Sequence, residues 1–461
     1  MTNGLSIRDV MEVVVYGIFI LTATRNVAYW WRMWFQSDRI AAERAAVRSN
    51  ADSVHPDFEI HYVIPAYQEV ESLPMTFRAL VRSMENSKYR SRLTIVTSKL
   101  DEPRFEGEVR TRTVAEALCA EYPGARCIID DSDSPSMAAS FNTGVDAVAR
   151  ERTGFEELTY VAVYNADSSA TLDSVQALGD TIVAREFPQV LQINYSSLRN
   201  LGEMSGLGGW YAMGAAYYQT RWAFGFEYDL HRRNSSARRA GPLGHSYHLK
   251  GHGLVLRVDT AVAVGGFSVD TPCEDLELGF RLSLQNIPVF VVPVVEDTEH
   301  PSTFSAVTAQ KKYWFSGMVD VVNFHRLSPE QWKAQRLRFE LQRGASLYRS
   351  AGCFLLAPVP YWILLGAAVG LGHPWLALPP LLNALASAVL LQRTLRRTGS
   401  TSALKGRIRN LFLPGAILVW SLTRNLGPVQ YLWSILRTSD RKSRMRSAQE
   451  RHIVESSGHT L

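Results

Sequence analysis

The sequence of 461 residues lacks the short motifs that identify several common classes of enzyme. It contains no GxGxxG fingerprint, no Walker sequence and no HExxH element, which argues against a dehydrogenase, an ATPase and a metalloprotease. Its four cysteines form no CxxC pair, so we predict neither a zinc site nor a disulfide framework and expect reduced thiols. An inverted hydrophobic repeat of the kind found in transporters is also missing.

A basic stripe with interleaved aromatic residues is absent too, which argues against a nucleic-acid partner. The net charge of +5 comes largely from arginine clusters beside apolar segments. This placement is typical of proteins that contact the anionic cytoplasmic face of a membrane. We therefore expect membrane lipids, and not nucleic acid, among the partners.

The apolar run at residues 10–31 is long enough to cross the hydrocarbon core of a bilayer. It has no small-residue cleavage site, so we predict a retained N-terminal anchor over 1–35 in preference to a signal peptide. Arginines follow this run in number, whereas only Arg8 precedes it, which predicts that the chain continues on the cytoplasmic side.

Further apolar runs lie toward the other end of the chain. They predict an interfacial helix over 326–350 and a transmembrane hairpin over 351–392. The run at 411–436 is interrupted by Pro414, Arg424 and Pro428, which favours a re-entrant or interfacial helical pair, with a full crossing as the alternative. A basic cytoplasmic tail over 437–461 follows. Together these segments predict a multi-pass protein of the inner or plasma membrane with a cytoplasmic central domain.

The central domain over 56–325 alternates β-like runs with helix-like stretches. Strands are expected at 61–67, 93–98, 126–131, 160–167 and 190–196, and helices at 73–84, 110–121, 136–150 and 171–186. Such alternation is typical of an α/β fold with a mostly parallel sheet and helices on both faces. Ligands of these sheets bind outside the carboxyl ends of the strands, so the polar residues there are the candidates for chemistry.

Two acidic elements stand out among these candidates. Asp167 follows a strand, where a carboxylate binds a divalent cation or, as the alternative, caps the next helix. Glu274 and Asp275 precede an apolar helix, where an acid acts as a general base in a cleft or, alternatively, interacts with the helix dipole. The aromatic stretch at 210–228 indicates either rings that bind an acceptor or packing against a membrane surface.

The order of the elements narrows these alternatives. Pro65-Ala66-Tyr67-Gln68-Glu69, Asn165-Ala166-Asp167, Glu274-Asp275-Leu276-Glu277-Leu278-Gly279 and Gln310-Lys311-Lys312-Tyr313-Trp314 follow one another between predicted membrane helices. This series resembles the family 2 inverting glycosyltransferases, in particular the membrane-embedded cellulose, hyaluronan and poly-N-acetylglucosamine synthases. The resemblance covers about residues 60–320 and implies a GT-A fold, Rossmann-like, with a nucleotide-sugar donor, commonly a UDP-sugar.

The resemblance also implies roles for individual residues. Asp275 matches the catalytic base, and Asp167 would hold Mg²⁺ or Mn²⁺ together with His300. The positions implied for donor binding are Ala66, Tyr67, Glu69, Ser98, Asn165, Gln310 and Lys312. The positions implied for acceptor binding are Glu274, Trp314, Gly251 and His252.

Three positions depart from the family pattern and remove charge from the expected donor site. Asn165 replaces the first Asp of D-x-D, Met137 stands where Lys is usual, and Tyr313 replaces the Arg of Q-x-x-R-W. Either neighbouring cations compensate for the lost charge, with Lys250, His300, Lys311 and Lys312 as the candidates, or the donor differs from a UDP-sugar or metal binding is weaker.

The sequence thus predicts an enzyme that extends a polysaccharide at the membrane, with oligomerisation as one way of completing a channel. The alternative is transfer of a single sugar to a lipid or polyprenyl-phosphate acceptor. A non-catalytic membrane scaffold is the third hypothesis.

Overall fold

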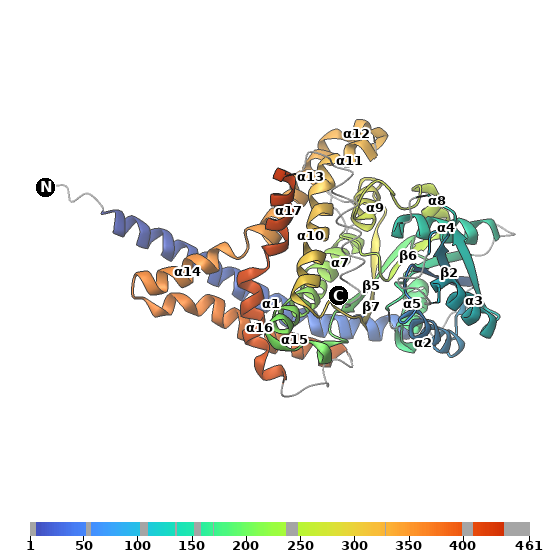
Figure 1. The fold of residues 1–461 in the computed structure, drawn as a ribbon, viewed down its shortest axis with the longest axis horizontal. Coiled ribbons are helices and arrows are strands. Elements are labelled where there is room, and N and C mark those ends of the chain that lie inside the picture. The colour runs from blue at the N-terminus through green and yellow to red at the C-terminus, as the bar shows by residue number, and fades with distance from the viewer. Residues whose placement is uncertain are drawn as a thin grey trace.

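The structure of the chain, a computed structural model, describes residues 6–51, 57–101, 109–133, 136–151, 158–168, 170–236, 248–327, 329–398 and 409–437. An α/β part lies at one end of the molecule, and long helices extend from it to form an arm at the other end (Figure 1).

A mixed sheet of seven strands forms the centre of the α/β part, in the order β3-β2-β1-β4-β6-β5-β7. The strands are β1 (Phe58–Ala66), β2 (Arg90–Ser98), β3 (Ala125–Asp130), β4 (Leu158–Val163), β5 (Val190–Ser196), β6 (Leu254–Arg257) and β7 (Val289–Asp297). The five predicted strands are confirmed as β1 to β5, whereas β6 and β7 were not predicted. The expectation of a mostly parallel sheet holds with one exception, because β6 runs antiparallel to β4 and to β5.

Helices cover both faces of this sheet. On one face lie α2 (Leu73–Glu85), α3 (Thr111–Glu121) and α5 (Leu172–Ala184), and on the other lie α4 (Met137–Glu151), α8 (Val258–Ala263) and α9 (Glu274–Leu284). The alternation of the strands explains the two cores, since Ile64 of β1 faces the first set of helices and its neighbour Val63 faces the second. The predicted helices at 73–84, 110–121, 136–150 and 171–186 are confirmed.

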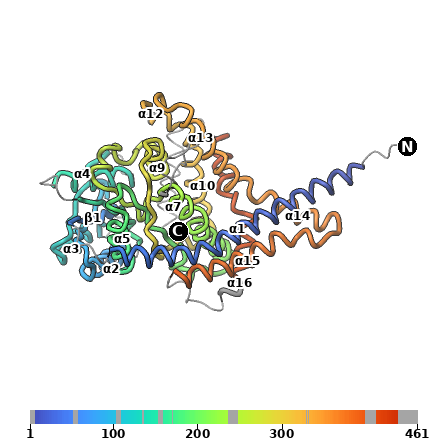
Figure 2. Tube along the Cα trace, turned by 180° about the vertical axis from the view of Figure 1, so that it is seen from behind, coloured from blue at the N-terminus to red at the C-terminus, as the bar shows by residue number. Residues whose placement is uncertain are grey.

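The remaining elements are mostly helical. They are α1 (Ile7–Ala51), η1 (Leu201–Glu203), α6 (Gly206–Trp222), the π-helical turn η2 (Ala223–Glu227), α7 (Tyr228–Ser236), α10 (Phe304–Asp320), η3 (Val321–Asn323), α11 (Phe324–Leu327), α12 (Pro329–Ala334), α13 (Arg336–Ser350), η4 (Ala351–Leu355), α14 (Val359–Gly370), η5 (Pro374–Ala377), α15 (Leu378–Thr398), α16 (Arg409–Thr423) and α17 (Leu426–Arg437). The long helix α1 lies beside α14 and α15 in the projecting arm (Figure 2).

Among the described residues, two helical stretches are long and apolar enough to cross a membrane, Arg336–Gly370 and Pro374–Thr398. Helices of this kind also form the cores of soluble proteins, so they do not by themselves establish a membrane location. Helix α1 does not meet the same criterion, and the N-terminal anchor therefore stays a prediction. The apolar run at 411–436 folds as two separate helices, α16 and α17. Beyond Arg437 the predicted basic tail lies outside the described residues.

Most of the aromatic segment at 210–228 is buried inside the protein, although Trp210 at its start is 37 % exposed. Tyr211, Tyr217 and Tyr218 are buried in a core that α6 shares with α1, α15 and α16. Both expectations for this segment, acceptor-binding rings and packing on a membrane surface, are therefore wrong for these buried rings. Their burial follows from contacts between helices that are distant in the sequence.

Candidate functional site

The polar ends of β1 and β2 lie side by side, because Ala66 pairs with Thr97 in the parallel ladder and Ser98 follows it. The chain after β1 turns sharply, with Gln68 at a φ of 56°. The buried carboxylate of Asp101 holds this turn by accepting hydrogen bonds from the backbone N–H groups of Gln68 (3.3 Å) and Arg112 (3.1 Å). Asp101 was not among the predicted site residues.

The remaining residues of this loop lie next to that turn. The backbone N–H of Glu69 donates to the hydroxyl oxygen of Thr111 (3.1 Å), and the carboxylate of Glu69 accepts a hydrogen bond from Ser72. Tyr67 is half-buried between Ala66 and this turn. The predicted donor residues Ala66, Tyr67, Glu69 and Ser98 are thus gathered at one edge of the sheet.

Asn165 and Asp167 lie in a tight turn directly after β4. The N–H of Ser168 closes the turn by donating to the carbonyl of Asn165 (3.1 Å), and the side chain of Asp167 is exposed. The helix that follows is capped by Thr171, whose hydroxyl oxygen accepts the N–H of Ser174 (3.1 Å). The alternative role of Asp167 as the cap of this helix is therefore excluded.

A cation that the sequence did not indicate lies beside this turn. Arg199 donates to the backbone carbonyl of Asp167 (3.4 Å), and its guanidinium is 3.8 Å from the carboxylate of Glu299. It belongs to the loop that follows β5, and its position at the carboxyl end of that strand is the only signal that would have found it.

Asp275 lies in the first turn of α9, half-buried, and its two carboxylate oxygens are both held by the backbone. Oδ2 accepts the N–H of Gly251 (2.8 Å) and Oδ1 accepts the N–H of Leu276 (2.7 Å). Burial raises the pKa of Asp275, and the two N–H donors oppose that rise because they stabilise the ionised form. For the neighbouring Glu274, burial and the negative charge of Asp275 raise the pKa to about 8. The pKa of both carboxyl groups thus lies above its usual value, and Glu274 retains its proton near neutral pH.

The segment that carries Gly251 is fixed against β5. The buried side chain of Gln192 accepts the N–H of Lys250 (3.1 Å) and donates to the carbonyl of His252 (2.9 Å), so it brackets Gly251 on both sides. Gly253 follows with a φ of 69°, and a Cβ at this position would lie 2.8 Å from the Cβ of Ile193. Glycine is therefore required where the chain turns into β6.

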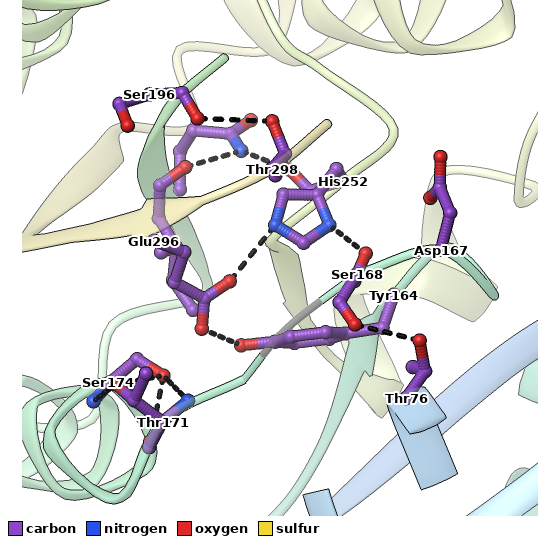
Figure 3. A network of polar contacts seen from close by, with 12 residues as sticks. Thr76, Tyr164, Asp167, Ser168, Thr171, Ser174, Ser196, His252, Glu296 and Thr298 are labelled. Carbon is purple, nitrogen blue, oxygen red and sulfur yellow. Dashed lines mark hydrogen bonds and ion pairs between the residues drawn. The ribbon is translucent and has the colours of Figure 1, made fainter. Parts of the chain in front are cut away.

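The prediction that His252 binds the acceptor is wrong. Its ring is buried, with 5 % of its surface exposed, and both ring nitrogens have protein partners. Nδ1 lies 2.8 Å from the hydroxyl of Ser168, and Nε2 lies 2.9 Å from a carboxylate oxygen of Glu296 (Figure 3). Sequence could not reveal this, because the partners come from the ends of β4 and β7.

Two of the predicted compensating cations are already engaged. The Nζ of Lys250 lies 2.5 Å from the buried carboxylate of Glu227, in the π-helical turn η2. Burial alone would raise the pKa of Glu227, but Lys250 and His248 outweigh it and lower that pKa to about 2. The Nζ of Lys311 is buried, donates to Gln219 (3.3 Å) and lies 3.8 Å from the ring centre of Trp314. Neither ammonium group faces a donor site freely.

His300 is also buried, and its backbone is held by Asn200 through two hydrogen bonds. Burial and the charge of Lys311 lower the pKa of His300 to about 3, so the ring is neutral near pH 7. Its Nδ1 lies 3.1 Å from the carbonyl of Pro301, and its buried Nε2 has no hydrogen-bond partner among the described residues. A neutral imidazole with a free lone pair is chemically a suitable metal ligand.

Within the described ranges, no three His, Cys, Asp or Glu side chains come together as a metal cluster. The exposed carboxylate of Asp167 nevertheless fits a hard cation of the Mg²⁺ type, because such an ion keeps water and substrate phosphates among its ligands. These protein ligands fit a metal ion that also binds a nucleoside diphosphate, and they do not fit a metal ion that is enclosed by protein.

The element at 310–314 lies on α10, which packs against α17. Gln310 has a buried side-chain carbonyl oxygen without a hydrogen-bond partner among the described residues, Lys312 and Trp314 are half-buried, and Tyr313 donates to the carbonyl of Pro272. The structure thus brings Tyr313 to the loop before Asp275, as a hydrogen-bonding group without charge. Met137, the third departure, is exposed at the start of α4.

Tyr195 is a further residue that the sequence did not single out. It lies at the end of β5, with the Nζ of Lys250 4.1 Å from its ring centre and the ring of His252 at 5.8 Å. Burial raises the pKa of Tyr195, as do the negative charges of Glu227, Asp275 and Asp167. Its hydroxyl therefore lies within electrostatic reach of the predicted base Asp275 and of the predicted metal ligand Asp167.

Comparison with known protein families gives a match to part of the chain. Residues 189–391 match the family described as glycosyl transferase family group 2. The chain is a glycosyltransferase. The matched segment begins just before β5 and includes α9 with Asp275, α10 with the element at 310–314, and α14. Strands β1, β2 and β4 of the glycosyltransferase, whose carboxyl ends carry the predicted donor residues, lie outside the matched segment.

Three solved structures illustrate what the glycosyltransferase is similar to. The mannosyltransferase PcManGT from Pyrobaculum calidifontis, in complex with GDP-Man and Mn²⁺, has 13% identity and a TM-score of 0.45 over 91% of this chain and 99% of that one. S. aureus TarS in complex with UDP has 10% identity and a TM-score of 0.35 over 81% and 92%. Glucosyl-3-phosphoglycerate synthase from Mycobacterium tuberculosis has 13% identity and a TM-score of 0.32 over 55% and 75%. A search of curated proteins finds no match.

Proposed function

We propose that the chain is an inverting glycosyltransferase of the GT-A type, in which Asp275 is the general base. It moves a sugar from a nucleotide-sugar donor to an acceptor hydroxyl at the cytoplasmic face of the inner or plasma membrane. The observation that carries this proposal is the placement of Asp275, whose two oxygens are oriented by the N–H groups of Gly251 and Leu276.

The chemistry of the carboxyl pair supports the proposal. An inverting transfer needs one base that removes the proton of the attacking hydroxyl, and such a base contributes about a hundredfold or more to the rate. The two backbone N–H donors stabilise the ionised form of Asp275, which is the form that acts as a base, against the effect of burial. Glu274 retains a proton near neutral pH and donates a hydrogen bond to an oxygen of the acceptor. No second nucleophilic carboxylate is required, because inversion proceeds without a sugar bound to the protein.

The donor side is proposed at the ends of β1, β2 and β4. Ala66, Tyr67, Glu69 and Ser98 would face the nucleoside, with Asn165, Gln310 and Lys312 near the diphosphate. Asp167 would hold Mg²⁺ or Mn²⁺, with His300 as a second ligand. When bound, this ion neutralises the charge that develops on the leaving diphosphate. Arg199, which contacts the backbone of Asp167, supplies a further positive charge at the same place.

The acceptor in the leading hypothesis is a growing polysaccharide that passes Glu274, Gly251 and Trp314, with a homo-oligomer as one way of completing a channel. A specific observation also favours a lipid-linked acceptor. An apolar groove of about 600 Å³ lies between α14 and the α16–α17 pair. Its lining residues are Trp362, Leu365, Leu422, Thr423, Asn425, Leu426 and Val429.

The proposal is tested by incubating purified protein with UDP-glucose, UDP-GlcNAc and GDP-mannose, with Mn²⁺ or Mg²⁺ and membrane lipid extract. Three proteins are compared: wild type, Asp275→Asn, and Asp270→Asn, which changes an exposed acid on the preceding loop. We expect wild type and D270N to consume one donor and D275N to be inactive. Equal turnover by wild type and D275N would exclude Asp275 as the base.

The product decides between the acceptors and tests the stereochemistry. A ladder of lengths indicates a polysaccharide, whereas one species extracted into organic solvent indicates a lipid acceptor. The anomeric proton coupling of the product, compared with that of the donor, reports inversion or retention. Resistance of the protein to extraction from membranes by alkaline carbonate tests the proposed location.

A further inference from the structure

His252 connects three segments that are far apart in the sequence. Its Nδ1 lies 2.8 Å from the hydroxyl of Ser168, after β4, and its Nε2 lies 2.9 Å from Glu296 on β7. Tyr164, at the end of β4, donates to the other oxygen of Glu296 (2.7 Å). All four side chains are buried, and Figure 3 shows them as one continuous chain of polar contacts.

The direction of the hydrogen bonds follows from the acceptor capacity of the carboxylate. Glu296, as a carboxylate, only accepts, so Tyr164 O–H and His252 Nε2–H both donate to it. In the neutral imidazole Nδ1 then has the lone pair, and the hydroxyl of Ser168 donates to it. Each group in the chain is thereby satisfied.

The hydroxyl–imidazole–carboxylate contacts of Ser168, His252 and Glu296 resemble the catalytic triad of a serine hydrolase. These residues do not act as a catalytic triad. Only 1 % of the surface of Ser168 is exposed, so its oxygen is not accessible to a substrate. A buried and fully satisfied network of this kind fixes the geometry of its surroundings.

On one side this network holds the turn with the proposed metal ligand. Ser168 directly follows Asp167, and its N–H closes the turn onto Asn165 (3.1 Å). The hydroxyl of Thr76 lies 2.6 Å from the carbonyl of Ala166 and 2.7 Å from that of Ser168, so α2 supports the same turn. The position of the Asp167 backbone is therefore tied to the His252 ring.

On the other side the network holds the proposed base. Gly251 precedes His252, and its N–H donates to Oδ2 of Asp275 (2.8 Å). The side chain of Gln192 binds the carbonyl of His252 and the N–H of Lys250, the residues on either side of Gly251. A rotation of the His252 backbone would therefore also move the N–H of Gly251. His252 thus contacts the Asp167 turn through its side chain, and its backbone adjoins the Gly251 N–H that binds Asp275.

We propose that His252 is a positioning residue that sets the placement of Asp167 relative to Asp275 through Ser168 and Gly251. This inference rests on the proposed function for the roles of the two aspartates, while the contacts stand on their own. The bound diphosphate lies against Asp167 and the acceptor hydroxyl against Asp275, so their alignment depends on this placement.

The test uses full-length wild type and the variants His252→Ala, Ser168→Ala and Tyr164→Phe. Ser83→Ala is the matched control, because Ser83 is also buried and its hydroxyl donates only within α2 (2.8 Å). The measurements are kcat, the KM for the donor, and the Mn²⁺ concentration that half-saturates the protein in the presence of UDP or GDP, taken from the electron paramagnetic resonance of free Mn²⁺.

We expect H252A and S168A to raise the half-saturating Mn²⁺ concentration and to lower kcat, each by about tenfold, with little change in donor KM. Y164F and S83A, which remove buried hydroxyls that do not touch the Asp167 turn, are expected to leave the Mn²⁺ requirement near that of wild type. Equal Mn²⁺ requirements in S168A, Y164F and S83A would overturn the inference. Such equality would mean that losing the hydroxyl of Ser168 has the same effect as losing any other buried hydroxyl.

The two proposals fail in distinguishable ways. If wild type turns over no donor but its binding of Mn²⁺ with a nucleoside diphosphate is weakened by H252A and S168A, the transferase mechanism is wrong and the positioning role is retained. If wild type is active and S168A matches S83A in every measurement, the positioning role is wrong and the mechanism is retained. A wild type that neither turns over nor binds Mn²⁺ with a nucleotide overturns both.

Discussion

The hydroxyl of Tyr313 on α10 donates a hydrogen bond to the carbonyl of Pro272, in the loop that leads into Asp275. The same loop is held again by Gly317, where a Cβ would lie 2.0 Å from the Sγ of Cys273. Helix α10 therefore packs directly against the segment that positions the proposed base. The sequence resemblance predicts an arginine at the position of Tyr313, and the contribution of Tyr313 here is a contact with the loop in place of a charge.

Replacing Tyr313 with Phe removes that hydrogen bond and keeps the aromatic ring. We expect a loss of about 1 kcal/mol in the free energy of unfolding, the usual net contribution of one such bond. We also expect a lower kcat at unchanged donor KM, because the loop before Asp275 is loosened while the donor side is untouched. Tyr348→Phe is the control, since Tyr348 is 81 % exposed. A Y313F enzyme with the kcat of Y348F would contradict this role.

The pKa of Glu274 gives the folded protein a defined dependence on pH. Burial and the charge of Asp275 raise this pKa from 4.5 to about 8, so folding favours the protonated form. The contribution of Glu274 to the free energy of unfolding is thus complete below pH 4.5 and is lost as the pH rises through 8. Glu274→Gln mimics the protonated state at every pH.

We therefore expect the unfolding temperature of wild type to fall relative to that of E274Q between pH 5 and pH 9. Differential scanning fluorimetry of both proteins in the same buffers measures the difference. Asp270→Asn, on an exposed acid nearby, should follow wild type throughout. A constant difference between wild type and E274Q over this range would show that Glu274 is ionised in the folded protein.

Arg199 is expected to bind the donor. Its guanidinium contacts the backbone of Asp167 and lies near Glu299, and its side chain is 20 % exposed, so it remains open to a phosphate. Arg199→Ala should raise the KM for the donor about tenfold, equivalent to ~1.4 kcal/mol of lost charge interaction. Arg199→Lys should recover part of the loss, because it restores the charge without the planar fork.

The exposed Arg78, whose side chain is 64 % accessible in its ion pair with Glu121, provides the control R78A. Initial rates at varied donor concentration, in buffers of low and high ionic strength, separate charge from packing. An R199A variant with the donor KM of R78A would place the phosphates elsewhere.

The parts of the fold that were predicted from sequence depend on short-range pattern. Strands β1 to β5 and helices α2 to α5 each show their own periodicity and end in polar residues. Strand β7 was missed because Pro293 interrupts its apolar run. The structure tolerates this proline because β7 is an edge strand, and its register with β5 shifts after Ile193 to pass over it.

The residues of the site likewise divide into those that local sequence predicted and those that it did not. Asp167 and Asp275 lie in recognisable motifs, whereas Arg199, Tyr195 and Gln192 lie on or after β5 without any motif. Their relevance comes from the neighbours that β5 acquires in the sheet, which local sequence does not encode. His252 was assigned wrongly for the same reason, since its burial depends on Ser168 and Glu296 from two other strands.

The packing of α17 on α10 depends on Gly427. A Cβ there would lie 2.7 Å from the backbone N of Lys312 and 2.7 Å from the carbonyl oxygen of Thr308, so neither neighbour can move without displacing α10. Gly427→Ala should cost about 1–3 kcal/mol in stability, as overpacking generally does. It should also lower activity, because the displaced segment carries Gln310 and Trp314 of the proposed site.

Gly366→Ala in α14 is the control for this substitution, since nothing lies within 4 Å of its added Cβ. Thermal unfolding and donor turnover of both variants, purified in the same detergent, measure the two effects. We expect G366A to behave as wild type, or to be slightly more stable because alanine favours a helix over glycine. If G427A unfolds at the temperature of G366A and keeps full activity, α17 does not support α10 in the working enzyme, and the close approach at Gly427 has no bearing on the site.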